Sequence, residues 1–199
     1  MKYSNIFDSH THSIHSFDGN HSCNALCDGA IEHGAIGIAI TDHCDIDMKD
    51  FEPENFAKVQ FADVTKTQTE YKDKLQVLHG IELGQGIFNK SLSEKILSDY
   101  KYDFVLGSIH NLKGLDDFFD YKQYNIKQLL NQYFEAELEL AEWGNFDSLA
   151  HLTYPLRYIV AREHIDVDIT EYYDVIEAIY KTLIKNDKAL ELNVSGLFM

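Results

Sequence analysis

Short apolar runs alternate with amphipathic stretches along the whole chain. The runs have the length and composition of buried strands, and they are Asn5–Asp8, Ile36–Ile40, Leu75–Leu83, Phe104–Ile109, Ser148–Leu152 and Ala189–Val194. Between them lie helical patterns, in which apolar residues recur at i, i+3, i+4 and i+7, as from Ile126 to Phe134 and from Tyr172 to Leu183. This alternation predicts an α/β fold with a mostly parallel sheet of six βα units, either open or closed into a barrel.

The composition indicates one folded domain over residues 1–199. No linker or low-complexity run divides the 199 residues, of which 45% are hydrophobic. With 33 acidic against 17 basic residues, the net charge of −16 disfavours nucleic acid and anionic lipid as partners. No apolar stretch approaches the roughly 18–20 residues that span a bilayer, and the first residues do not form a signal peptide. We therefore expect a soluble, cytoplasmic protein without a disulfide framework, since only three cysteines are present.

The histidines are unusually frequent, at ten in 199 residues, and many follow predicted strands. Residues with metal-ligand chemistry lie in or just after five successive strands, and these are His12, His43, Glu82, His110 and His151. The carboxyl ends of parallel strands share one edge of the sheet, where the sites of α/β folds are built. His10 lies two residues before His12, so both side chains point the same way in an extended segment. This arrangement predicts a centre for zinc, manganese or iron.

Other histidines have simpler explanations. His79 is an odd number of residues from Glu82 on the same strand and should face the opposite side. His33 precedes Gly34 at a predicted helix end, where a cation is favourable. His15 and His21 lie nearer to the predicted centre, and either could replace a missing ligand.

Taken together, these motifs resemble those of the polymerase-and-histidinol-phosphatase (PHP) domain. The resemblance covers essentially the whole chain, and its motifs are His10-Thr11-His12, Ser16-Phe17-Asp18-Gly19, Thr41-Asp42-His43, Gly80-Ile81-Glu82, Ser108-Ile109-His110 and Ala150-His151. The segments His151–Tyr158 and Leu190–Asn193 are similar to the histidinol-phosphatase branch in particular.

The resemblance implies a distorted (β/α)7-type barrel that holds two or three divalent metals at its carboxyl edge. His10 and His12 would bind the first metal, with Glu82 as a bridge, and these three residues would position a metal-bound water for catalysis. Asp18 and His43 would bind the second metal. The third would be held by Glu82, His110 and His151.

One departure from the family concerns its seventh strand, which supplies an Asp-x-His pair. The last histidine here is His164, so nothing after Asn193 can supply that pair. The chain therefore resembles a truncated or split member with about six strands, or a naturally short one. An open edge at Leu190–Val194 would then favour a homodimer or cause poor solubility.

The implied chemistry is hydrolysis of a small phosphorylated substrate. Clustered divalent cations reverse the local field of an acidic protein and attract a phosphate ester. Of the two arginines, Arg157 lies in the family-like segment and is predicted to bind phosphate, while Arg162 is equally consistent with a surface role. The leading hypothesis is L-histidinol phosphate hydrolysis in histidine biosynthesis. The alternatives are a phosphoesterase for nucleotides or other sugar phosphates, a metal-dependent amidohydrolase, and a non-catalytic metal-binding remnant.

Overall fold

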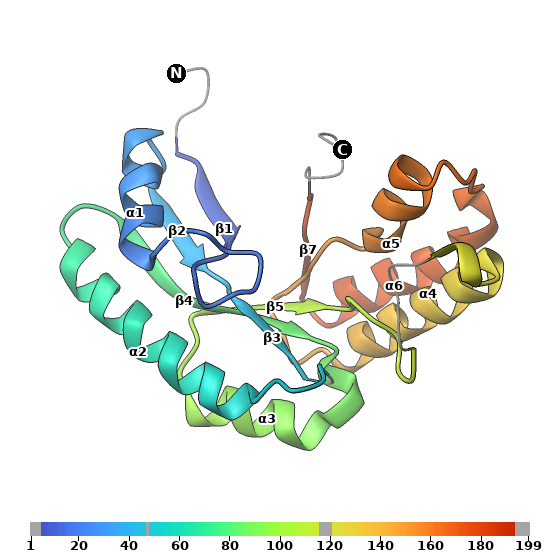
Figure 1. Ribbon diagram of the computed structural model, residues 1–199, viewed down its shortest axis with the longest axis horizontal. Helices are drawn as coiled ribbons and strands as arrows, with labels where there is room; N and C mark the ends of the chain where they lie inside the picture. Colours follow the sequence, from blue (N-terminus) through green and yellow to red (C-terminus); the bar gives the residue numbers. More distant parts are fainter. Residues whose placement is uncertain (1–4, 47, 116–120, 194–199) are drawn as a thin grey trace. The chain divides into compact units, whose positions relative to one another are not determined.

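The structure, a computed structural model, describes residues 5–46, 48–115 and 121–193. Strands and helices alternate along it (Figure 1). The strands are β1 (Phe7–Thr11), β2 (Gly37–Ile40), β3 (His43–Asp45), β4 (Gln76–Gly84), β5 (Phe104–Ser108), β6 (Ser148–Leu149) and β7 (Ala189–Leu190). The α-helices are α1 (Cys23–Glu32), α2 (Pro53–Tyr71), α3 (Lys90–Asp99), α4 (Ile126–Trp143), α5 (Tyr154–Leu156) and α6 (Tyr173–Lys185). Short 3-10 segments span Gly86–Asn89, Tyr121–Gln123 and Ile169–Tyr172, and a π-helical turn spans Arg157–Arg162.

The chain forms two compact units. Unit 1 comprises Met1–Leu83 and Lys90–Leu106, and unit 2 comprises Gly84–Asn89 and Gly107–Met199. In unit 1 the strand order is β1-β2-β4 followed by the first part of β5, with β3 paired to β4. β1, β2 and β4 are parallel, with Phe7 opposite Gly37 and Ile38 opposite Val77. Every residue of β2 is buried, as expected for a parallel strand covered on both faces.

Helices α1 and α2 cover one face of the unit 1 sheet. Their apolar side chains pack with those of β2 and β4 into one core, which contains Cys23, Cys27, Ile38, Ile40, Val64, Tyr71, Leu75 and Val77. Helix α1 begins at the predicted cap, because the Ser22 side chain accepts a hydrogen bond from the Ala25 amide. It ends with His33 as its C-cap, followed by Gly34 with φ of +77°. Because Cys23 belongs to this core, the core holds the first turn of α1, where the loop from β1 ends.

Unit 2 is built around α4 and α6. The periodic residues predicted from the sequence form its core, and Leu130, Tyr133, Phe134 and Ile179 are fully buried. Helix α4 is capped by Asn125, whose side chain accepts from the Gln128 amide, and it ends at Gly144 with φ of +64°. β6 pairs in parallel with β7, with Ser148 opposite Ala189. The Ala150 amide donates to the Gly107 carbonyl of β5 at 2.9 Å, which joins β6 to the last part of β5.

The predicted α/β class and the six predicted strands are confirmed in the described residues, with differences at the ends. β1 is longer than expected toward its carboxyl end, because Thr11, beyond the predicted Asn5–Asp8, pairs with Ile40 of β2. β7 is shorter, and Val194 lies outside the described residues. The three-residue strand β3 was not predicted, since polar residues surround its one apolar position. No helix in the described ranges is both long and apolar enough to cross a membrane.

Candidate metal centre

Two histidines and one glutamate converge at the carboxyl edge of the unit 1 sheet. His10 lies in β1, His12 directly follows the last residue of that strand, and Glu82 lies on β4 with its side chain fully buried. The Nε2 atoms of His10 and His12 lie 3.1 Å apart, and they are 3.2 and 3.1 Å from Oε2 of Glu82. Two imidazole nitrogens and a carboxylate oxygen therefore lie close together, in agreement with the predicted spacing of two residues between the histidines.

A second group lies beside the first and shares His12. Nδ1 of His12 lies 3.0 Å from Oδ1 of Asp18, and Nε2 of His43 lies 3.5 Å from Oδ2 of Asp18. Nδ1 of His43 is also 3.2 Å from Oε2 of Glu82. All five residues that were predicted as ligands in this unit thus lie within one connected cluster.

The carboxylates dominate the electrostatics of this cluster. Burial lowers the pKa of His12, but hydrogen bonds and charge from Asp18 and Glu82 outweigh it and raise the pKa to about 9. Burial opposes ionisation of Asp18, yet the bonds to His12 and His43 bring its pKa well below its ordinary value. The cluster therefore favours positive charge at its centre, which a divalent cation supplies more fully than a proton.

The loop that carries Asp18 is held by a buried aspartate. Asp42 is fully buried, and it accepts hydrogen bonds from the amide and hydroxyl of Ser13 and from the Ser16 hydroxyl. The Ser16 hydroxyl in turn accepts from the His43 amide at 2.9 Å. Gly19 closes the loop, because a Cβ there would clash with the Ser13 carbonyl oxygen. Asp42 therefore positions both the loop and His43.

Unit 2 contributes a separate pair of histidines. Nε2 of His110 and Nε2 of His151 lie 3.2 Å apart, and both residues are buried. The ring of Tyr154 packs against both imidazoles, with centroid distances of 5.2 and 5.1 Å. These imidazoles follow β5 and β6, as the sequence predicted.

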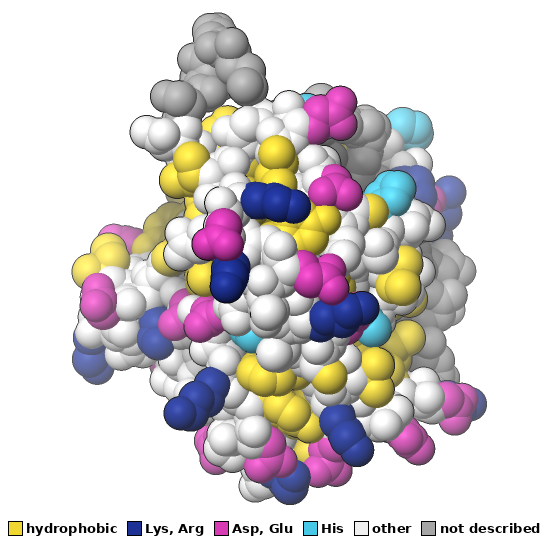
Figure 2. All heavy atoms as spheres, turned by 90° about the vertical axis from the view of Figure 1, so that its left-hand side faces the viewer, with side chains coloured by type: hydrophobic (Ala, Val, Ile, Leu, Met, Phe, Trp, Pro, Cys, Tyr) yellow, Lys and Arg dark blue, Asp and Glu magenta, His cyan; other side chains and the backbone are white. Residues whose placement is uncertain are grey.

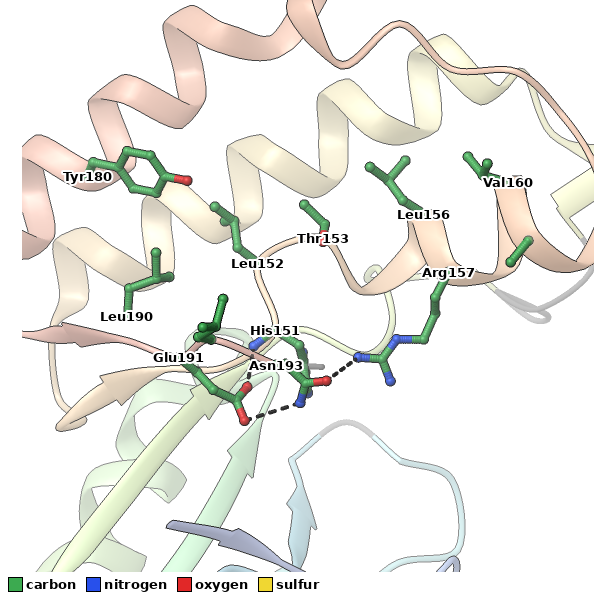
Figure 3. Close-up of a pocket in the computed structure, with 12 residues that line it drawn as sticks. His151, Leu152, Thr153, Leu156, Arg157, Val160, Tyr180, Leu190, Glu191 and Asn193 are labelled. Atoms are coloured by element: carbon green, nitrogen blue, oxygen red, sulfur yellow. Dashed lines mark hydrogen bonds between the residues drawn. The ribbon is translucent and has the colours of Figure 1, made fainter. Parts of the chain in front are cut away.

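Arg157 lies at the end of a chain of hydrogen bonds in unit 2. Its guanidinium donates to Oδ1 of Asn193 at 3.2 Å, and the Asn193 amide group donates to Glu191 at 3.1 Å (Figure 3). Glu191 also accepts from the backbone amide of His151 at 2.7 Å. The Arg157 guanidinium lies over the Tyr154 ring, 5.1 Å from its centroid. Asn193, Glu191 and Tyr154 thus connect Arg157 to His110 and His151, the histidine pair of the same unit.

These residues line a pocket of about 440 Å³ (Figure 3). One side of it is polar, with His151, Arg157, Glu191 and Asn193, and the other is lined by leucine, valine and tyrosine side chains. Arg162 also borders aromatic rings, but its Nε donates to Glu163 at 2.7 Å. Arg157 is therefore the arginine of this pocket.

Sequence reasoning missed three residues of these networks, namely Asp42, Glu191 and Asn193. Glu191 and Asn193 are two apart in an extended segment, so both can reach the same side, and this alternation was a usable signal. Asp42 was visible within Thr41-Asp42-His43, but its role depends on donors from a distant loop. The metal-ligand roles of His10, His12, Asp18, His43, Glu82, His110 and His151 stay predictions.

The donor sets fit divalent metal ions. Ligand atoms around a tetrahedral zinc ion, with bonds of roughly 2.0–2.1 Å, lie about 3.3 Å from one another. The 3.1–3.2 Å separations between His10, His12 and Glu82 are close to this value. Imidazole and carboxylate donors suit zinc, manganese or iron.

Two relatives share most of their length with this chain. A probable histidinol-phosphatase from Clostridium acetobutylicum is 31% identical over 198 residues, which are 96% of this chain and 74% of that protein. A histidinol-phosphatase from Lactococcus lactis is 26% identical over 191 residues, which are 94% of this chain and 70% of the relative.

Solved structures show the same fold. The histidinol phosphate phosphatase of L. lactis, crystallised with zinc, L-histidinol and phosphate, has a TM-score of 0.77 at 26% identity, covering 94% of this chain and 72% of that one. A Listeria monocytogenes protein has a TM-score of 0.80 at 19% identity, covering 97% and 84%. The predicted fold class, an incomplete α/β barrel of this type, is confirmed. The PHP domain family model also matches residues 8–195, which include parts of both compact units, and the chain therefore belongs to the PHP domain family.

Proposed function

We propose that this protein is a metal-dependent phosphomonoesterase that hydrolyses L-histidinol phosphate to histidinol and phosphate. The observation that carries the proposal is the convergence of His10, His12 and Glu82 within 3.1–3.2 Å in a chain similar to a phosphatase solved with zinc, L-histidinol and phosphate. In the reaction, a water oxygen forms the new bond to phosphorus while the ester P–O bond breaks. The histidinol oxygen leaves with that bond's electron pair and takes up a proton.

The protein's own residues supply binding and orientation. Metal ions bound in such clusters act as Lewis acids and make water nucleophilic near neutral pH. His10, His12 and Glu82 would hold one ion, and Asp18 and His43 a second. The assignment of Glu82, His110 and His151 to a third ion rests on the family resemblance, and we propose zinc in two or three sites.

Arg157 is the proposed phosphate ligand. Its planar guanidinium can bind two phosphoryl oxygens at once, and this geometry is not available to lysine. Stacking over Tyr154 and the bond to Asn193 orient the group toward the pocket. Arg157 thus has a fixed direction before substrate arrives, which lowers the entropic cost of binding.

The remaining proposals concern the cellular location of the protein and its partners. We propose that residues 1–199 act as one PHP domain in the cytoplasm and that a second copy pairs at the segment that begins in β7, where Leu192, just after the strand, is 90% exposed. Nucleic acid is not expected to bind. On the face in Figure 2, the lysines and arginines among the described residues stand apart, with acidic side chains between them.

Phosphate release by metal-loaded protein tests the function. We expect kcat/KM for L-histidinol phosphate to exceed that for a nucleoside monophosphate or a hexose phosphate by at least about 100-fold, as polar recognition of a substrate allows. Chelation should abolish the activity, and added zinc or manganese should restore it. A preference for nucleotides would instead identify the alternative phosphoesterase. Metal-loaded protein that hydrolyses none of these esters would be a non-catalytic metal-binding protein, and the proposal would be wrong.

A further inference from the structure

A second type of ligand cluster lies in unit 1, apart from the centre described above. It joins three elements: His15 in the loop after β1, Cys23 in the first turn of α1 and Asp63 on α2. Nε2 of His15 lies 3.0 Å from Oδ2 of Asp63, and Sγ of Cys23 lies 3.6 Å from the same oxygen. All three ligand atoms lie within 4.8 Å of one another. None of these residues belongs to the predicted metal ligands of the phosphatase centre.

The spacing of these atoms matches a tetrahedral ligand set. With zinc bonds of roughly 2.3 Å to sulfur and 2.0–2.2 Å to nitrogen and oxygen, tetrahedral ligands lie about 3.3–3.6 Å apart. The two separations from Oδ2 of Asp63, 3.0 Å to Nε2 of His15 and 3.6 Å to Sγ of Cys23, are close to these values. Cys23 is buried, whereas the side chains of His15 and Asp63 are 18% and 39% exposed. A cation could therefore reach the cluster from the side of His15 and Asp63.

The same surroundings argue against a nucleophilic cysteine. Burial is the main cause that raises the pKa of the Cys23 thiol, to about 12, and the charge of Asp63 acts in the same direction. Reactive cysteines need the opposite, a lowered pKa beside positive charge. A thiol held in its protonated form next to an imidazole and a carboxylate becomes a thiolate only when a cation replaces its proton.

We propose that His15, Cys23 and Asp63 form a separate binding site for a zinc-class divalent cation, with water in the fourth position. Binding releases the thiol proton of Cys23 to solvent. The ion would join the loop after β1 to both helices that cover the sheet. Since that loop carries Asp18, the site would also limit its movement.

Cobalt(II) offers a selective probe, because this is the one ligand cluster in the described part of the chain that contains sulfur. The predicted ligands of the phosphatase centre in this unit, His10, His12, Asp18, His43 and Glu82, offer nitrogen and oxygen alone. Thiolate bound to cobalt gives an intense charge-transfer absorption in the near ultraviolet, which imidazole and carboxylate ligands do not give. Titration of chelator-treated, full-length protein with cobalt should produce this band with a stoichiometry of one.

Matched cysteine variants decide the assignment. Cys23→Ser should abolish the charge-transfer band and lower the bound metal by one ion per chain, as measured by elemental analysis. Cys27→Ser, one turn further along α1, and Cys44→Ser should keep the band, although all three cysteines are buried. Asp63→Asn and His15→Ala should weaken cobalt binding at least about tenfold. Circular dichroism of each variant checks that it is folded.

The outcomes also separate this site from the phosphatase. Phosphate release by Cys23→Ser loaded with zinc should persist, because the variant keeps all the predicted ligands of that centre. Absence of the band in folded wild-type protein would overturn the proposal. So would a band that survives Cys23→Ser and Asp63→Asn. Failure of the phosphatase assay alone would leave the cobalt result unaffected, since the two readouts are independent.

Discussion

The carboxylate of Glu82 lies 3.1 Å from Nε2 of His12, although Glu82 lies on β4, His12 directly follows β1, and β2 separates these two strands in the sheet. Gly80 on β4 lets this strand pass close to the end of β2, because a Cβ there would lie 2.5 Å from Cγ2 of Thr41 and 2.7 Å from the Ile40 carbonyl oxygen. The buried carboxylate is thereby the common neighbour of His10, His12 and His43.

Replacing Glu82 by glutamine should remove metal without disrupting the packing. The side chain is fully buried, so an isosteric amide keeps its volume but loses the negative charge. Mutation of residues that merely orient metal ligands lowers metal affinity about 10–100-fold. Because Glu82 is itself a shared predicted ligand, its replacement should lower metal affinity more than about 100-fold. Elemental analysis and phosphate release would both measure the loss. Glu135→Gln, on the exposed side of α4, should retain metal and activity. A metal-replete, active Glu82→Gln protein would contradict the assignment.

Arg157→Ala should raise KM for the phosphate ester and leave the metal content unchanged. Charge-assisted hydrogen bonds contribute about 1.5–3 kcal/mol each, which corresponds to roughly a tenfold or larger rise in KM. Arg157→Lys should recover only part of the loss, since lysine lacks the planar fork. Steady-state kinetics at fixed zinc would provide the measurement.

Arg162→Ala is the matched control for this prediction. Its guanidinium is engaged by Glu163 and lies over the Tyr158 ring, so its loss should leave KM unchanged. If Arg162→Ala raised KM while Arg157→Ala did not, the phosphate-binding role would belong to Arg162.

Leu192→Lys should weaken self-association. Leu192 is 90% exposed, and in the described residues the strand next to it, β7, pairs with β6 alone. Burying one leucine contributes about 1.5–3 kcal/mol, so a charge there should weaken a dimer more than about tenfold. Sedimentation velocity over a concentration series would detect the change, with Met48→Lys in unit 1 as a surface control. Wild-type protein that stays monomeric throughout the series would rule out pairing at this segment.

Much of the fold could be predicted because βα units have a regular length. Strand ends that recur at intervals of one unit brought His12, His43 and Glu82 to one edge without any knowledge of contacts. Local periodicity also identified the buried face of α4. These features depend on residues near one another in sequence, which is why pattern alone was sufficient.

Contacts between distant segments could not be predicted in the same way. β1 continues to Thr11 because the Thr11 amide donates to the Thr41 side chain and its hydroxyl donates to the Ala39 carbonyl, contacts that no local propensity encodes. The role of Asp42 likewise depends on Ser13 and Ser16, nearly thirty residues away. His15, which the sequence offers as a substitute ligand for the main centre, contacts Asp63 on α2, a contact that the local pattern does not indicate.

Glu137 provides a prediction on stability and pH. This carboxyl is buried in unit 2, where its Oε1 accepts from the Tyr133 hydroxyl at 2.6 Å. Burial raises its pKa from an ordinary value of 4.5 to about 8, and the Tyr133 bond and the charge of His110 only partly oppose this. The folded protein therefore keeps a proton that the unfolded chain releases. The contribution of protonated Glu137 to the free energy of unfolding is complete below pH 4.5 and is lost as pH rises toward 8.

Glu137→Gln should remove this pH dependence, because an amide mimics the protonated carboxyl at every pH. Relative to the variant, wild-type protein should lose about 1.4 kcal/mol of unfolding free energy per pH unit between pH 5 and 8. Urea unfolding of chelator-treated protein would measure it, since a cation near His110 would also lower the pKa of Glu137. Glu135→Gln, exposed on the same helix, should follow the wild-type profile. Parallel pH profiles for wild-type and Glu137→Gln protein would mean that Glu137 is ionised in the folded state, so its buried charge would need a compensating partner.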